Sequence, residues 1–574
     1  QECVHLTFVP QNPQDFGFSG SLFILADSTW RVKRAEMGIP SKSDVNFVEQ
    51  MDIIQEFADL PTGEHVLVDD KMLVQLKLAK FLQKFQLERT TKYSDYSFEE
   101  IPEKVFKFKG QLRTEANAMM RDDDFWAQHR AEELTKSESK MDEFIHRLEN
   151  IKGFNFVLFV MKAFIENFVE TTADPKKPSK VDIGPVNTMI THNFVDGLRL
   201  RASAQTTANL NPHWFLSGYG AYGLKDKRWK YSGTLTYSFN KRDYVVWEFP
   251  KHYISATYSY DVMSPMDKFL FTDKDNIFLS LKTTTVDQMS YMRDATINYE
   301  LETPTGFGVK AMLRHRNDEP TGKLEYLRND AAQTRVHDVT TSEASMTLRY
   351  APGESFVNSK QRRVPVSLDA PVFTLTHAMG FKGVLGGEYN FNRTEASIWK
   401  RFWLPASWGK IDCSVKAGAE WNTVPFPLLI LPEANLSYIT QRETFCLINN
   451  MEFLNDRFAS MSISYDMNGK LFNRIPLLKN LKWREMFRVR ALWGTLTDKN
   501  NPFKSSNPDL FRFPTRDGKF TSFVMDPKVP YVEASVGIYN IFKLLHVEYV
   551  HRFTYRDNPG INKNGIRFMV LMVF

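Results

Sequence analysis

From about residue 196 onward, hydrophobic and polar residues alternate in one segment after another. In the segment that begins at Leu198, the apolar positions are Leu198, Leu200, Ala202 and Ala204. The polar positions between them are Arg199, Arg201, Ser203 and Gln205. Successive side chains of a β-strand point to opposite faces, so this pattern predicts strands with one apolar and one polar face. Similar segments begin near Trp229, Ala295, Ala344 and Ala459.

The number and length of these segments decide between two kinds of β-protein. We count roughly sixteen to eighteen of them between about residues 183 and 574, many of about 9 to 12 residues. Strands of globular proteins average about 5 to 6 residues, whereas membrane strands need about 9 to 11. The sequence therefore predicts a mainly β chain with a transmembrane antiparallel β-barrel of about 16 strands. The alternative is a large soluble β-protein with one solvated face.

The end of the sequence, "GIRFMVLMVF", fits a closing barrel strand. Its alternate positions would face lipid, and they are Ile566, Phe568, Val570, Met572 and Phe574. The opposite face, Met569, Leu571 and Val573, is unusually apolar for a barrel interior, so we expect an inward loop to cover it. Aromatic residues near the segment ends, such as Trp214 and Trp229, are typical of an interfacial girdle.

The rest of the chain is organised differently. Residues 1–116 predict a periplasmic β-rich domain, residues 117–180 a helical segment and linker, and residues 181–574 the barrel. The stretch at 153–169 is apolar nearly all round, which fits either a buried helix or a helix lying in the membrane interface. We expect long non-strand insertions at about 317–343 and 495–530, and a short amphipathic helix within 468–483 on the periplasmic side.

Composition narrows the functional classes. The net charge is +5, from 73 basic and 68 acidic residues, and the basic residues are scattered, so we expect no nucleic-acid partner. Three cysteines without a Cys/His cluster predict no structural zinc. No stretch of 18 apolar residues is present, so a transmembrane helix is not predicted. No motif of a hydrolase, nucleotide-binding or metalloprotease site occurs, and we predict a protein that is not an enzyme and has no cofactor.

Several longer phrases resemble a known protein family. They are "VPQNPQDFGFSGSLFILADSTWRV", "DDDFWAQHRAEELTKSE", "GYGAYGLKDKRWKYSG" and "EFLNDRFASMSISYDMNGKLFNRIPLLKNLKWRE". The chain resembles outer-membrane β-barrel proteins of Bacteroidota that have no assigned function and carry a carboxypeptidase-regulatory-like domain. This resemblance implies an immunoglobulin-like domain ahead of residue 1 and no peptidase activity. More distantly, the family resembles the BamA/TamA superfamily, which implies insertion or translocation of other proteins.

Two sets of residues are candidates for functional positions in the barrel. A barrel seam is expected where the first strand meets the last, at Gly184, Pro185, Phe568, Val570, Met572 and Phe574; proline cannot donate to a strand ladder. Lumen-facing charges are expected at Arg199, Arg201, Lys230, Glu300 and Glu302.

The function we expect is envelope biogenesis in the bacterial outer membrane, by insertion or translocation of outer-membrane or surface proteins. The alternatives are a channel or solute carrier, and a structural subunit of a larger outer-membrane complex. Expected partners are outer-membrane lipid, lipopolysaccharide, and other outer-membrane or periplasmic proteins.

Overall fold

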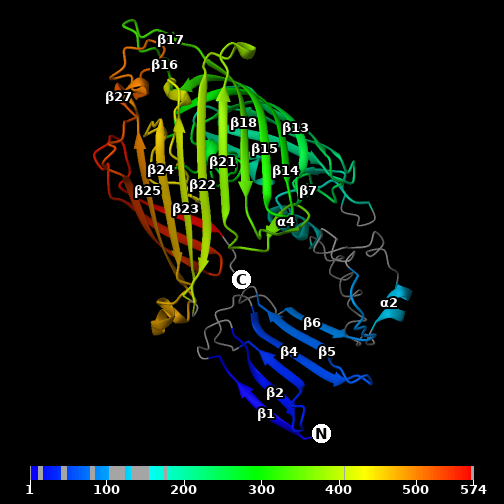
Figure 1. Cartoon of the computed structure of the whole chain (residues 1–574). Coiled ribbons are helices and arrows are strands. Elements are labelled where there is room, and N and C mark those ends of the chain that lie inside the picture. Colours follow the sequence, from blue (N-terminus) through cyan, green and yellow to red (C-terminus); the bar gives the residue numbers. More distant parts are fainter. Residues whose placement is uncertain are drawn as a thin grey trace. The chain divides into compact units, whose positions relative to one another are not determined.

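The computed structural model (Figure 1) describes residues 2–10, 17–39, 48–77, 85–102, 123–130, 154–172, 177–405, 408–441 and 443–570. The chain divides into two compact units. One comprises Gln1–Ile151 with two short C-terminal pieces, and the other comprises Lys152–Ile541 and Leu545–Leu571. Among the described residues, no helix has the length and apolarity that a membrane span requires.

The first unit contains a six-stranded antiparallel sheet whose strands pair in chain order. The strands are β1 (Cys3–Phe8), β2 (Ser19–Leu25), β3 (Val32–Gly38), β4 (Val48–Asp59), β5 (His65–Leu76) and β6 (Phe85–Lys92). The register aligns Leu6 with Leu22, and Met37 with Ile53 and Met72. Because these residues share one face, the sheet has an apolar side. The predicted N-terminal β-rich region is confirmed.

Two helices are described in the region that the sequence predicts to be helical. They are α2 (Asp123–His129) and α4 (Phe154–Glu166), and the rest of that prediction lies outside the described residues. Asn167, with a positive φ of 62°, ends α4 in the left-handed conformation that asparagine tolerates. The reading of 153–169 as a buried helix is wrong for this chain, because Phe156 and Phe164 of α4 are mostly exposed. Nothing in the sequence itself indicates which surface such a helix meets.

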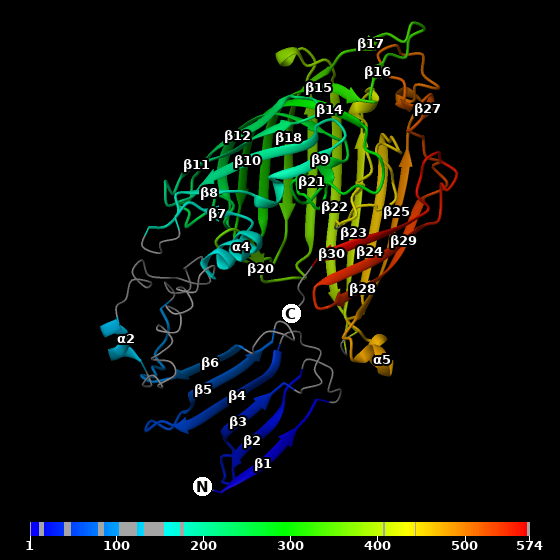
Figure 2. The ribbon, with the colours of Figure 1, turned by 180° about the vertical axis from the view of Figure 1, so that it is seen from behind.

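The second unit is a closed barrel of antiparallel strands (Figures 1 and 2). Its long strands are β10 (Gly197–Thr206), β11 (Trp214–Gly223), β12 (Trp229–Ser238), β13 (His252–Met263), β14 (Gln288–Glu302), β15 (Phe307–Gly322), β18 (Val339–Tyr350), β21 (Val372–Gly380), β22 (Phe391–Trp403), β23 (Lys410–Glu420), β24 (Arg457–Asp466), β25 (Arg484–Thr495), β28 (Tyr531–Ile541), β29 (Leu545–Arg552) and β30 (Asn564–Val570). The strand order closes through β7 (Val169–Glu170), β8 (Val181–Ile183) and β9 (Ile190–Asn193). The predicted mainly β fold with one large antiparallel sheet is confirmed.

The connections between strands hold only short elements. Three hairpins lie in them: β16 (Tyr326–Leu327) with β17 (Arg335–Val336), β19 (Phe356–Asn358) with β20 (Arg363–Pro365), and β26 (Thr515–Arg516) with β27 (Lys519–Phe520). In the predicted amphipathic stretch, α5 covers only Pro476–Lys479.

The insertion predicted at 317–343 is too long. Residues 317–322 continue β15 and 339–343 begin β18, so the insertion spans only the residues between Gly322 and Val339. The polar run at Asn317–Glu319 lacks alternation, which hides the strand in the sequence. It forms a strand because β14 supplies its backbone partners, with Arg293 opposite Asn317.

In the barrel wall, apolar side chains are exposed and polar side chains are buried, which is the opposite of the pattern in a sheet of a soluble protein. Along β10, the apolar residues Leu198 and Leu200 are exposed, whereas Arg199 and Arg201 are buried. The same outward apolar row crosses the neighbouring strands, where the register aligns Leu216, Leu235, Ala256, Ile297 and Leu313. The outer surface is therefore apolar and the inner surface is polar.

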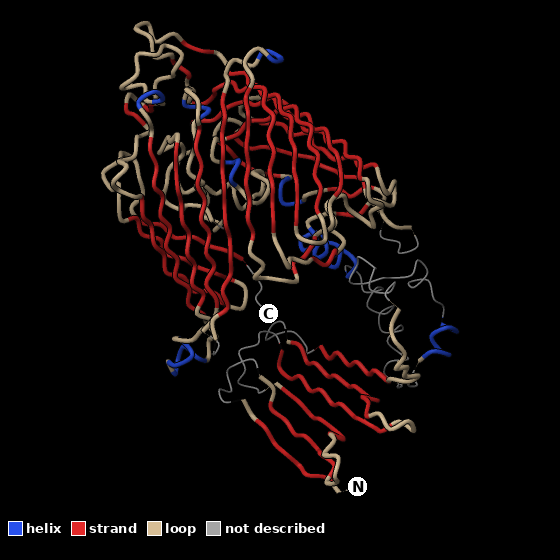
Figure 3. The backbone as a smooth tube through the Cα atoms, in the orientation of Figure 1, coloured by secondary structure: helices blue, strands red, loops and turns tan. Residues whose placement is uncertain are grey.

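The barrel interior contains a packed core. The 421–456 segment, which connects β23 to β24, contributes buried apolar side chains almost along its whole length, including Phe426, Leu436, Phe445 and Phe453. They cluster with side chains of the connection between β25 and β28, such as Phe511. Figure 3 shows loops beyond both ends of the strands and among them. This apolar core occupies part of the space that the strands enclose.

Candidate functional site

The first strand of the barrel is broken into two halves. β8 and β9 both pair with β10, and the 3₁₀ turn η2 (Val186–Thr188) separates them. Gly184, at the break, has a φ of +145°, and a Cβ there would lie 2.7 Å from the carbonyl oxygen of Asn167. Only glycine fits this close approach. Pro185 follows it and precedes the turn, at a position where no ladder bond is needed.

The last strand pairs on its outer edge with a loop. The N–H of Phe568 in β30 donates to the carbonyl of Tyr438, and the N–H of Thr440 donates to the carbonyl of Phe568, both at 2.8 Å. Ile439 and Phe568 form a parallel bridge. On its other edge β30 pairs with β29 in the ordinary antiparallel way. The 421–456 segment therefore occupies the position where the first strand would close the wall.

A second loop continues this contact toward the first strand. The 264–287 segment connects β13 to β14, and its Leu281 and Thr283 bond to the backbone of Tyr438 and Leu436 at 3.0 and 2.8 Å. Nearer the first strand, the N–H of Ile277 donates to the carbonyl of Asn187 in η2 at 2.8 Å. Among the described residues, no backbone hydrogen bond joins β30 to β8 or β9.

We call this junction the loop-sealed seam: the 264–287 and 421–456 segments between η2 and β30. Five backbone hydrogen bonds of the described residues run across it. Apolar side chains of these segments are exposed there, namely Phe271, Ile277, Phe278, Leu281 and Tyr438. Figure 2 shows β9 and β30 on the same side of the barrel. Among the described residues, loop segments thus supply the backbone partners given for the outer edge of β30.

Buried ion pairs hold the 421–456 segment inside the barrel. Glu533 of β28 accepts hydrogen bonds from the backbone N–H groups of Cys446 and Leu447 at 2.8 and 3.0 Å, and pairs with Arg490 of β25 at 3.0 Å. Glu452 in the segment pairs with Arg552 of β29. In addition, Arg567 of β30 donates to the carbonyl of Cys446. Inward side chains of four adjacent strands, β25, β28, β29 and β30, thus bind this one segment.

A second buried network ties the 264–287 segment to the first strands. Arg199 is fully buried and pairs with Asp196, Asp261 and Asp275 at 2.7–3.0 Å, and Arg201 pairs with Asp275 at 2.8 Å. Burial by itself would raise the pKa of Asp275, but the surrounding cations hold that pKa below its ordinary value. Asp275 therefore stays charged inside the barrel.

Lys230 joins the same network from β12. Its ammonium group pairs with Asp196 and with Asp226, the latter at 2.5 Å. Glu300 and Glu302 lie elsewhere, at the other end of β14, where they pair with Lys251 and Arg363 at 2.7 Å. The five residues expected to line the lumen thus belong to two separate ion-pair groups at opposite ends of the wall.

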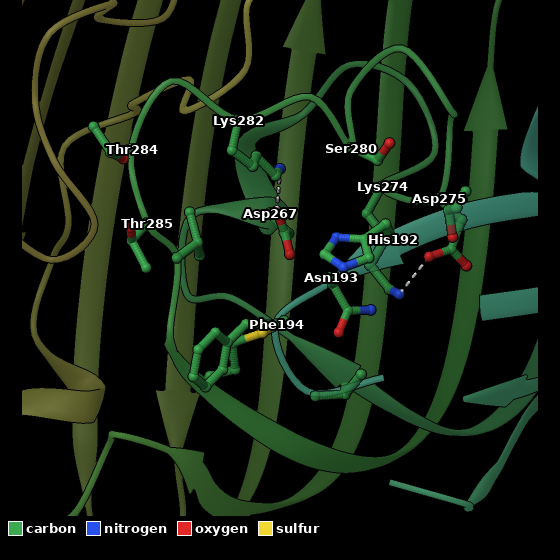
Figure 4. A pocket seen from close by; sticks show the side chains of 14 residues that line it. His192, Asn193, Phe194, Asp267, Lys274, Asp275, Ser280, Lys282, Thr284 and Thr285 are labelled. Atoms are coloured by element: carbon green, nitrogen blue, oxygen red, sulfur yellow. Dashed lines mark hydrogen bonds and ion pairs between the residues drawn. The ribbon is translucent and has the colours of Figure 1, made fainter. Parts of the chain in front are cut away.

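A cavity of about 280 Å³ lies between the first strand and the 264–287 segment (Figure 4). His192 and Asn193 of β9 line it from one side, and Lys282 lies across from them. The charged groups in it are paired, Lys274 with Asp275 at 2.9 Å and Lys282 with Asp267 at 3.5 Å. Over the described residues, no group of three or more His, Cys, Asp or Glu side chains is arranged to bind a metal ion.

The expected seam residues are only partly brought together. Gly184 and Pro185 lie at the break in the first strand, whereas Phe568 contacts the inserted loop. Val570 is exposed at the end of β30. Met572 and Phe574 lie outside the described residues.

Sequence reasoning anticipated an inward loop but not which segments provide it. One signal was present: residues 424–439 form the largely apolar run "VPFPLLILPEANLSYI" without alternation between two clear strands. Such a run predicts burial without strand pairing. The 264–287 segment carries no comparable signal, because its charged residues read as a solvated loop.

The structure is similar to BamA from Haemophilus ducreyi lacking POTRA domains 1–3, with 10% identity over 68% of this chain and 70% of that chain and a TM-score of 0.42. It is also similar to CdiB from Acinetobacter baumannii, with 10% identity over 66% and 57% of the two chains and a TM-score of 0.32. OccK11 (OpdR) from Pseudomonas aeruginosa shares 10% identity over 65% of this chain and 90% of that chain, with a TM-score of 0.26.

No curated protein matches the chain. The sequence model described as "Family of unknown function (DUF5686) C-terminal domain" matches residues 168–503, which is more than half of the chain and runs from β7 into the connection after β25. The chain therefore belongs to the DUF5686 family.

Proposed function

We propose that this protein is a non-enzymatic barrel of the bacterial outer membrane that acts in envelope biogenesis, by inserting or translocating outer-membrane or surface proteins. The loop-sealed seam is the route by which a client would pass between the barrel and the bilayer. The first unit would lie in the periplasm. Its contacts would be with outer-membrane lipid, lipopolysaccharide, and other outer-membrane or periplasmic proteins.

The exposure pattern supports the membrane location. Exposed apolar side chains such as Leu198 of β10, Leu235 of β12 and Leu313 of β15 lie along the outer wall. Soluble monomers rarely expose contiguous apolar patches beyond a few hundred Å², whereas lipid-facing strands require them. The polar residues that alternate with them, such as Arg199, are buried inside.

The filled interior argues against an open channel. The 421–456 segment packs an apolar core across the lumen and is held there by Glu533, Arg490 and Arg552. A water-filled pore would need a polar, hydrated path at this level. The charges expected to line such a pore are instead engaged in ion pairs, and Arg199, Arg201 and Lys230 among them are buried. Transport through the lumen would require displacement of the whole segment.

The seam is the observation that carries the proposal. An ordinary wall junction such as β13–β14 aligns twelve residue pairs, whereas five backbone hydrogen bonds to loops cross the seam. Each hydrogen bond contributes a net of about 1 kcal/mol. Opening the seam therefore breaks fewer backbone hydrogen bonds than opening a long strand junction such as β13–β14. It would also release the edge of β30, whose free N–H and C=O groups can pair with an incoming strand.

Depletion of the protein followed by quantitative proteomics of the outer membrane, surface lipoproteins included, tests this function. We expect many unrelated barrels or surface lipoproteins to fall together. An unchanged membrane proteome would overturn the biogenesis role. Loss restricted to one protein complex would instead indicate a structural subunit.

A further inference from the structure

We propose that α4 is a membrane-interface helix that anchors the broken first strand of the barrel to the surface of the bilayer. The proposal rests on the outer-membrane location proposed above and concerns a part of the chain that the seam mechanism does not use. Three observations carry it: the exposure of the helix, its length, and its attachment to η2.

The helix exposes apolar side chains over most of its circumference. Six of them are between 47 and 78% exposed: Phe156, Phe159, Val160, Met161, Phe164 and Ile165. At the angular spacing of an α-helix, these positions spread over roughly two thirds of the circumference. Lys162 and Glu166 occupy the remaining strip. A groove on a protein partner contacts a narrower stripe of about 100°, whereas acyl chains and headgroups can surround a helix on several sides.

The length of the helix excludes a spanning orientation. Its thirteen residues extend about 20 Å, and the hydrocarbon core of a bilayer is about 30 Å thick. An apolar helix of this size, with one basic residue on its narrow polar strip, is suited to lie in the plane of the interface. Lys162 pairs with Glu170 of β7 at 3.1 Å, which keeps the polar strip turned toward the protein.

The C-terminal end of the helix is bonded directly to the break in the first strand. The carbonyl of Asn167 accepts the N–H of Val186 at 2.9 Å. The side chain of Asn167 accepts the N–H of Asn187 at 2.9 Å and donates to its amide oxygen at 3.0 Å. Just beyond, β7 pairs with β8, so the helix and the first strand form one continuous piece. Both views of the chain place α4 beside β7 (Figures 1 and 2).

Apolar side chains are also exposed on the strands near the attachment of α4. Ile183 of β8 and Ile190 of β9, on either side of η2, are exposed, and Leu198 and Leu200 follow on β10. The occupant that fits both surfaces is the same lipid leaflet. A helix held in that leaflet fixes η2, and with it the first-strand side of the seam, while the outer edge of β30 bonds to a loop.

Depth-dependent quenching in vesicles tests the proposal. The full chain, with Cys3, Cys413 and Cys446 replaced by alanine, receives a single cysteine for a bimane label at α4 (Phe164→Cys or Val160→Cys). Leu235→Cys on the outer face of β12 and Glu99→Cys in the first unit are the membrane and water controls. The protein is reconstituted in phosphatidylethanolamine and phosphatidylglycerol vesicles that contain nitroxide-labelled lipids.

We expect the α4 labels to be quenched by nitroxides near the headgroups about twofold or more above the Glu99→Cys control, as for an interfacial helix. If Leu235→Cys is quenched and the α4 labels are not, the barrel is in the membrane but the proposal for α4 is overturned. Protection of α4 from both nitroxide and aqueous iodide would mean that protein covers it, which also overturns the proposal. If no label is quenched, the membrane location fails first and the α4 proposal fails with it.

Discussion

The backbone N–H of Phe568, in the last strand of the barrel, donates a 2.8 Å hydrogen bond to the carbonyl of Tyr438. Tyr438 lies at the centre of a loop that folds into the lumen. Two loop segments bond to each other and to this edge between η2 and β30. Release of these segments is therefore the conformational change on which the proposed function depends.

A disulfide across this contact should block the function. Ile439 and Phe568 form a parallel bridge, so cysteines at both positions fall within the separation that a disulfide spans. We expect cells with Ile439→Cys/Phe568→Cys to lose assembly of client proteins under oxidising conditions and to recover with a reductant. Growth and outer-membrane proteomics measure the effect.

The matched control for this cross-link joins two ordinary wall strands. Thr234 and Thr257 face each other across β12 and β13, with their hydroxyl groups 2.9 Å apart. A Thr234→Cys/Thr257→Cys disulfide should leave function intact. Equal loss of function in both pairs would show that the seam does not open.

Removal of Glu533 should loosen the lumen-filling segment. The Glu533→Ala variant leaves Arg490 unpaired and two backbone N–H groups of the 421–456 segment without their acceptor. A buried unpaired group costs about 1–3 kcal/mol or more. We expect ion conductance in planar bilayers to appear or to rise severalfold over the wild type. Asp517→Ala, at an exposed carboxylate, is the control, and conductance equal to the wild type in both variants would contradict the account.

The buried network around Arg199 should dominate barrel stability at the first strands. Arg199→Ala leaves Asp196, Asp261 and Asp275 with too few cations in a buried site, and the loss of one partner of a buried ion pair costs about 3–5 kcal/mol. Lys504→Ala removes an exposed pair with Asp498 and should cost at most about 1 kcal/mol. The stabilities of the two variants are compared in heat-modifiability gels, by the temperature at which the band of the folded protein disappears. Similar shifts would contradict the prediction.

The depressed pKa of Asp275 predicts an acid dependence. Because the folded-state pKa lies below the ordinary value of 3.8, the carboxylate contributes stability that is fully present above that value and is lost as pH falls toward the folded pKa. We expect Asp275→Asn to be less stable than the wild type at neutral pH. The difference in the free energy of unfolding between the two proteins should narrow as the pH falls below about 4. A difference that stays constant with pH would contradict a stabilising role for the Asp275 carboxylate charge.

A charge on the outer wall should prevent membrane insertion. Leu235→Arg places a guanidinium on the exposed apolar row of β12, at a cost of about 2–4 kcal/mol near the bilayer midplane. Leu210→Arg, on an exposed apolar residue in the turn between β10 and β11, should be tolerated. Folding yield into lipid vesicles measures both. Equal yields would mean that the outer row faces water.

The sequence predicted the wall better than what fills it. The alternation around Leu198 and Arg199 identifies β10 and its two faces, because strand periodicity is local and each face meets one environment. The 421–456 segment is buried only because strands far along the chain enclose it, and no local pattern encodes that enclosure. The same holds for the polar run at Asn317, which becomes a strand through pairing with β14.

The seam illustrates a further limit. Gly184 and Pro185 were predicted as part of a seam with the last strand, and the structure places them at a break within the first strand. The partner of Phe568 could not be predicted, because its contact with Tyr438 depends on a loop that reaches across the lumen. Residue types reveal where a ladder is weak, but they do not reveal what replaces it.

The loop-sealed seam also bears on the order in which the barrel can fold. The outer edge of β30 can find its backbone partners only after β23 and β24 have formed and the segment between them has entered the lumen. That segment in turn bonds to the connection between β13 and β14. Contacts so distant along the chain form late, because long loops must close first. Edge pairing of the last strand is thus expected to be a terminal event in folding, and until then β30 remains a single exposed strand edge at risk of pairing with another chain.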